Sequence, residues 1–72
     1  MTARELIRIL KALGAVQVRQ RGSHVRFQAG KWSTTVPVHK GEDLRPGTLA
    51  AIVRDLEPKL GPDWLRRYLD RR

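Results

Sequence analysis

His24 is the side chain best suited to chemistry, because it follows a predicted turn at Arg21-Gly22 and begins a strand that continues with Arg26. An imidazole can exchange a proton near neutral pH. In metal-independent RNA cleavage, such a base takes the proton from a ribose 2′-hydroxyl, which then attacks the adjacent phosphate. Gly22 would let the backbone approach that phosphate closely, and Ser23 would donate a hydrogen bond to it. The alternative is a surface histidine with no chemical role.

Two further kinds of side chain could serve the same reaction. Arg19 and Arg26 are suited to stabilise a pentavalent phosphate, because a guanidinium binds two phosphate oxygens at once. They could equally be solvated charges or simple phosphate anchors. His39 could supply the proton for the leaving group, or it could merely end a strand.

A second group of residues predicts an anion site. Lys40 and Arg45 lie close to Pro46-Gly47-Thr48, where free amides at the start of a helix would attract negative charge. An RNA phosphate would bind there without any reading of base sequence. Ordinary capping of the helix by Thr48 or by solvent is the alternative.

Other chemistries lack the residues they need. The two histidines have neither cysteine nor an acidic pair beside them, so we expect no metal site and no cofactor. A phosphate-cradling glycine loop, a Walker-type lysine motif and a nucleophile elbow are also missing, which disfavours a metal-dependent or serine hydrolase. Three aromatic residues could stack on bases, although packing in the core or against a partner is the simpler role: Trp32, Trp64 and Tyr68.

Composition points to a polyanionic partner. The 72 residues include 15 Lys and Arg against 7 Asp and Glu, a formal net charge of +8. Charge this dense favours nucleic acid, an acidic protein, or both. Cysteine is absent, no apolar run approaches the roughly 20 residues of a membrane span, and no secretory signal is visible. We therefore expect a cytoplasmic protein with no membrane contact.

The first helix is predicted over residues 3–13. Thr2 and Glu5 have the spacing of a capping box, apolar residues follow at helical intervals, and Gly14 suits the left-handed position that ends a helix. Polar and apolar residues then alternate before and after the Arg21-Gly22 turn, which predicts two strands of a hairpin. A third strand is predicted from Trp32 to Val38. Because Pro37 cannot donate to a sheet ladder, this third strand is expected near an edge or to end close by.

Two more helices are predicted after a polar loop over residues 39–43. Pro46 suits a first helical position, and Pro58 is expected to stop that helix near Glu57. Gly61-Pro62-Asp63 indicates the start of a short third helix. Its apolar side would carry Trp64, Leu65, Tyr68 and Leu69, and its basic side Arg66, Arg67, Arg71 and Arg72.

The resulting fold class is α+β, with a three-stranded antiparallel sheet and helices on one face. The helices are expected to cover the face that carries Val16, Val18, Val25, Phe27, Val36 and Val38. The opposite face would stay wet, with Gln17, Arg19, His24, Arg26 and Thr35, and with His39 at its rim.

Three linked motifs resemble the HicA toxins of HicA-HicB toxin-antitoxin systems. They are VRQRGSH from Val18 to His24, TVPVHKG from Thr35 to Gly41, and LRPGTL from Leu44 to Leu49. The resemblance runs from the first helix to about Leu56. Residues 1–72 would then form a single domain, with a family core over 1–57 and a C-terminal helical extension over 58–72.

The resemblance implies a fold like a double-stranded RNA-binding domain and an mRNA interferase activity with His24 as the catalytic residue. It also implies a HicB-type antitoxin that hides this histidine and neutralises the basic face. From their charge and position we expect these residues to bind RNA: Arg19, Arg21, Gly22, Ser23, Arg26, Lys40, Arg45 and Thr48. A non-catalytic RNA-binding module of the same fold is the main alternative, and an interaction protein with an acidic partner is a third.

Overall fold

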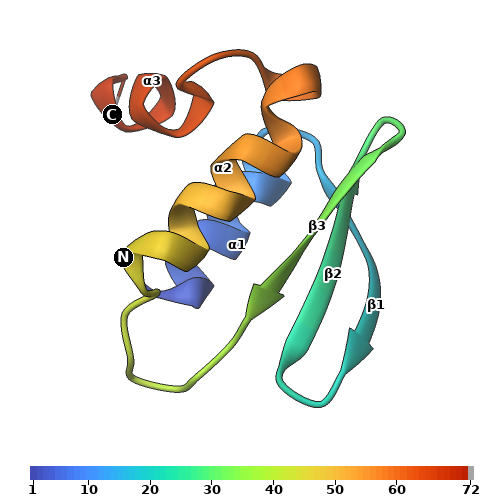
Figure 1. Cartoon of the computed structure of the whole chain (residues 1–72), viewed down its shortest axis with the longest axis vertical. Coiled ribbons are helices and arrows are strands. Elements are labelled where there is room, and N and C mark those ends of the chain that lie inside the picture. Colours follow the sequence, from blue (N-terminus) through green and yellow to red (C-terminus); the bar gives the residue numbers. More distant parts are fainter. Residues whose placement is uncertain (72) are drawn as a thin grey trace.

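The computed structural model describes residues 1–71 and contains three helices and one sheet within that range (Figure 1). The elements are α1 Ala3–Ala12, β1 Val16–Arg21, β2 His24–Ala29, β3 Trp32–Pro37, α2 Pro46–Leu60 and α3 Trp64–Asp70. The strands are antiparallel in the order β1-β2-β3. The predicted α+β class and element order are confirmed. Across residues 1–71, no helix is long and apolar enough to cross a bilayer.

α1 begins where the predicted capping box places it. The Glu5 amide donates to Thr2 Oγ1 at 3.2 Å, and the Thr2 amide donates to Glu5 Oε1 at 3.2 Å. These bonds satisfy amides that the first turn of a helix leaves without partners. Gly14, with φ of 92°, follows the C-cap residue Leu13 and turns the chain toward the sheet.

The core lies between the helices and the β2–β3 half of the sheet. Figure 1 shows α1 and α2 on the same side of the sheet, and the helices contact mainly β3. Phe27 of β2 and Val36 of β3 are fully buried beneath them. Thr34, also buried, donates from Oγ1 to Asp55 Oδ2 of α2 at 2.9 Å, which joins the sheet to the helix. β2 and β3 are therefore held firmly against the helices.

β1 differs from the prediction, because the helices do not cover it. Val16 is 60% exposed and Val18 50% exposed, so neither belongs to the core. A register shift between Gln17 and Arg19 interrupts the pairing with β2, and it places Gln17 opposite Phe27 and Val16 opposite Gln28. Gln17 therefore lies on the helix side of the sheet and Val16 on the wet side, which is the reverse of the faces that unbroken strand alternation predicts. A bulge of this kind inserts one residue and changes the face of those before it.

Pro58 does not stop α2 as predicted, since the helix continues to Leu60. Proline in the last turn removes only the amide that would donate to the Arg54 carbonyl, so the helix can run on for a few residues. Gly61, with φ of 95°, ends it and donates from its amide to the Glu57 carbonyl at 2.8 Å.

The predicted third helix is confirmed as α3, and Trp64 anchors it to α2. Trp64 is buried, and its indole Nε1 donates to the Val53 carbonyl at 2.9 Å. Leu65 is buried beside it, whereas Arg66, Arg67 and Arg71 are exposed. Arg72, predicted on the same basic side, lies outside the described residues.

Candidate functional site

A cationic cleft opens on the sheet face that the helices leave uncovered. It has a volume of about 310 Å³ and is lined by Arg19, Arg21, His24, Arg26 and Thr35. His24 is exposed at the start of β2, so its imidazole is accessible to a ligand. The structure thus brings together the histidine and the arginines that the sequence had assigned to one face. We call this feature the His24 cleft.

Strand register determines which charges meet in the His24 cleft. Arg19 lies opposite Arg26, and Arg21 lies opposite His24. Arg21 therefore ends β1 and faces the histidine, instead of standing in the turn as predicted. Like charges directly opposite each other across a pair of strands destabilise a sheet. An anion between them would remove that repulsion, so the arrangement favours binding of a phosphate.

Arg26 is fixed on the sheet by its neighbours on β3. Its Nη1 donates to Thr35 Oγ1 at 2.8 Å, and its Nη2 donates to Ser33 Oγ at 2.6 Å. Both partners come from β3, whose register places Thr35 directly opposite Arg26. A guanidinium held in this way keeps its remaining N–H donors in a fixed direction. Arg26 can therefore present a pre-organised donor to a phosphate oxygen.

The Gly22-Ser23 turn joins Arg21 to His24, two of the residues that line the cleft. Gly22 has φ of 57°, a left-handed conformation that glycine adopts without strain and that a two-residue hairpin turn requires. Gln20 Nε2 donates to the Gly22 carbonyl at 3.2 Å, and the Ser23 carbonyl accepts from the Val38 amide at 2.6 Å. The turn is thus joined to the residue that follows β3, and this bond holds the start of β2, where His24 lies, in position.

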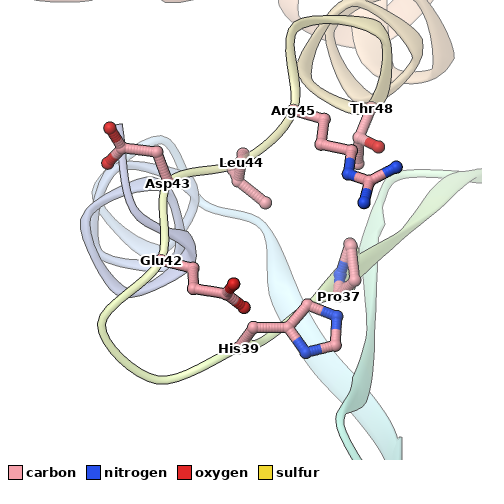
Figure 2. Close-up of a pocket in the computed structure, with 7 residues that line it drawn as sticks. All are labelled: Pro37, His39, Glu42, Asp43, Leu44, Arg45 and Thr48. Carbon is pink, nitrogen blue, oxygen red and sulfur yellow. The ribbon is translucent and has the colours of Figure 1, made fainter.

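A second pocket lies between the end of β3 and the start of α2. It has a volume of about 420 Å³ and is lined by Pro37, His39, Glu42, Asp43, Leu44, Arg45 and Thr48. Figure 2 shows the Arg45 guanidinium directed into this pocket from the start of α2, while the Asp43 carboxylate points away from the other side chains. Asp43 instead pairs with the amino group of Met1 at 3.5 Å. We call this feature the His39 pocket.

The predicted anion site at α2 is assembled only in part. Arg45 is the N-cap residue of α2, and no side chain caps the helix, so capping by Thr48 is not observed. Arg45 and Thr48 line the His39 pocket, but Lys40 is not among its lining residues. The Glu42 carboxylate, which was not among the predicted site residues, shares the pocket. This site is therefore less cationic than the His24 cleft.

Aromatic residues contribute unequally to the exposed surface. Trp64 is a core residue and is not available for stacking on bases. Trp32 is 38% exposed, with the Lys31 ammonium 5.3 Å from its ring centroid, a cation–π geometry. Within residues 1–71, no three histidine or acidic side chains gather where they could hold a metal ion.

Comparison with known proteins assigns the family. The model of the HicA toxin of bacterial toxin-antitoxin systems matches residues 3–57 of the 72-residue chain, from α1 into the last turn of α2. The chain therefore belongs to the HicA toxin family. No curated protein and no solved structure matches significantly. Membership in a toxin-antitoxin family implies an antitoxin as a partner, while α3 lies beyond the matched segment.

Proposed function

We propose that this protein is an mRNA interferase toxin, a metal-independent ribonuclease that uses His24 as its general base. The observation that carries the proposal is the exposed imidazole of His24 in a cleft walled by Arg19, Arg21 and Arg26. Family membership supports it, because the resemblance assigns catalysis to the histidine of the Gly22-Ser23-His24 motif. Cleavage of transcripts would inhibit translation and growth.

In this mechanism His24 takes the proton from the 2′-hydroxyl of the substrate ribose. The 2′-oxygen attacks the adjacent phosphorus, the bond from phosphorus to the 5′-oxygen breaks, and the products carry a 2′,3′-cyclic phosphate and a 5′-hydroxyl. Arg26 and Arg19 stabilise the added negative charge of the pentavalent phosphate. The Gly22-Ser23 backbone leaves room for close approach, and the Ser23 hydroxyl donates to a phosphate oxygen.

Neighbouring phosphates would extend along the basic surface. Arg21 contacts the RNA backbone beside His24. Arg45 and Thr48 contact a further phosphate at the start of α2, and Lys40 lies in the loop before that helix. These contacts position the RNA without selecting its sequence. The antitoxin is proposed to be of the HicB type, with acidic groups that neutralise the same surface and cover His24.

The proposed activity is tested by comparing an RNA oligonucleotide with a DNA oligonucleotide of the same sequence, both in the presence of excess EDTA. We expect cleavage of the RNA and none of the DNA, because only RNA carries the attacking 2′-hydroxyl. Salt-sensitive binding of RNA without any cleavage would instead support the alternative, a non-catalytic RNA-binding module.

Replacement of Arg19 by alanine should weaken RNA binding and reduce its dependence on salt. Each phosphate contact contributes about 0.7 to the slope of log affinity against log salt for a single strand, so the slope should fall by about that amount. The measurement is a series of binding isotherms at increasing salt. Arg8→Ala is the matched control, because it removes the same charge from the exposed side of α1. Equal effects of the two variants would contradict a phosphate contact at Arg19.

A further inference from the structure

His39, the second histidine of the chain, comes two residues after Pro37, the cross-strand partner of His24. The Val38 amide donates to the Ser23 carbonyl at 2.6 Å, so pairing continues one residue beyond β3. Because hydrogen-bonded and non-hydrogen-bonded pairs alternate along an antiparallel ladder, the adjacent pair His24 and Pro37 is a non-hydrogen-bonded one. Side chains of such pairs lie especially close together. Pro37 is therefore the immediate neighbour of His24 on the wet face.

Pro37 also forms a wall of the His39 pocket. Pro37 and His39 both line that pocket, and Figure 2 shows the imidazole of His39 beside the proline ring. His39 follows Pro37 by two residues, in the loop after the end of β3. Pro37 is thus a neighbour of both histidines, and each histidine is exposed and lines a separate pocket.

This placement meets a requirement of the cleavage reaction. The attacking and leaving oxygens lie roughly in line on opposite sides of the phosphorus. An imidazole that takes a proton from the attacking oxygen is therefore badly placed to protonate the leaving oxygen in the same step. A second proton donor is needed, within about 2.6–3.2 Å of the leaving oxygen when the substrate is bound.

We propose that His39 is the general acid of the reaction. The inference rests on the proposed ribonuclease activity of His24. With the substrate phosphate above Pro37, His24 accepts the 2′-hydroxyl proton as the bond from the 2′-oxygen to phosphorus forms. His39, in its protonated state, gives a proton to the 5′-oxygen as the bond from phosphorus to that oxygen breaks. His24 then loses a proton to water and His39 regains one, which restores the starting state.

Other groups in the His39 pocket suit this role. The Arg45 guanidinium points into the pocket from the start of α2, where it can bind the phosphate that follows the cleaved bond (Figure 2). Figure 2 also shows the Glu42 carboxylate directed toward the side of the pocket that His39 occupies. Arg45 is therefore a positioning residue, whereas His39 contacts the reacting oxygen.

The test uses two substrates, an ordinary RNA and the same RNA with sulfur in place of the leaving 5′-oxygen. A thiolate leaves without protonation, so the sulfur substrate does not need a general acid. On ordinary RNA, His39→Ala and His39→Gln should each lower the cleavage rate by about 10²–10⁴-fold. On the sulfur substrate both variants should cleave at close to the wild-type rate. His24→Ala should be slow on both substrates.

Two results would overturn the assignment of His39. One is a His39→Ala variant that cleaves ordinary RNA as fast as the wild type. The other is an equal loss on both substrates, which would indicate a role in RNA binding or in structure. His39 is exposed, so both variants are expected to fold, and circular dichroism checks this. If the wild type cleaves neither substrate, the proposed ribonuclease function itself fails, and the role of His39 fails with it.

Discussion

His24→Ala should lower the rate of RNA cleavage by about 10²–10⁴-fold, the usual contribution of a general base. The fold should be unchanged, because His24 is exposed and its side chain contributes nothing to the core. RNA affinity should change little, since Arg19 and Arg26 remain in the cleft. The measurement is the single-turnover cleavage rate at saturating RNA, which separates chemistry from binding.

Gln17→Ala serves as the control for this variant. Gln17 is also an exposed strand residue, but it lies on the helix side of the sheet, opposite Phe27. We expect wild-type cleavage from Gln17→Ala, and in cells we expect growth inhibition to persist with Gln17→Ala and to disappear with His24→Ala. Undiminished cleavage by His24→Ala would exclude the histidine as the base.

Phe27→Ala should have the largest effect on stability. Phe27 is fully buried at the centre of the sheet, beneath the helices. Truncating a buried phenylalanine lowers the free energy of unfolding by about 3–5 kcal/mol, because apolar contacts are lost and a cavity remains. Domains of this size have only about 5–15 kcal/mol in total. Urea unfolding should therefore show a much lower midpoint, or a chain that is largely unfolded without denaturant.

Val18→Ala is the informative comparison for Phe27→Ala. Both residues belong to apolar positions that the sequence assigned to the covered face, but Val18 is 50% exposed. Substitution at such a surface position should change the free energy of unfolding by no more than about 0.5 kcal/mol. A large loss from Val18→Ala would mean that β1 is covered by the helices after all.

Local patterns were enough to predict most of the fold. The Thr2 and Glu5 pair located the start of α1, and Gly22 located the first hairpin turn. Those signals act within a few residues, so they are visible in the sequence. The face of β1 was not predictable in the same way, because alternation assumes an unbroken register and the bulge at Gln17 to Arg19 breaks it.

The candidate site was predictable in its residue types but not in its contacts. The hairpin alternation placed Arg19, His24 and Arg26 on one face, which depends only on strand periodicity. The hydrogen bonds from Arg26 to Thr35 and Ser33 depend on the register in which β2 pairs with β3, and local residue patterns do not specify that register. The end of α2 was predicted three residues too early, because a helix tolerates a proline such as Pro58 in its last turn, and the sequence alone does not show which turn is the last.

The proposed function is tested most directly by the chemical nature of the ends that cleavage produces. Purified protein is incubated with an RNA oligonucleotide in excess EDTA, and the products are identified by mass spectrometry. Attack by the 2′-hydroxyl predicts a 2′,3′-cyclic phosphate on one fragment and a 5′-hydroxyl on the other. Fragments with a 3′-hydroxyl and a 5′-phosphate, or RNA that stays intact, would contradict a metal-independent ribonuclease based on His24.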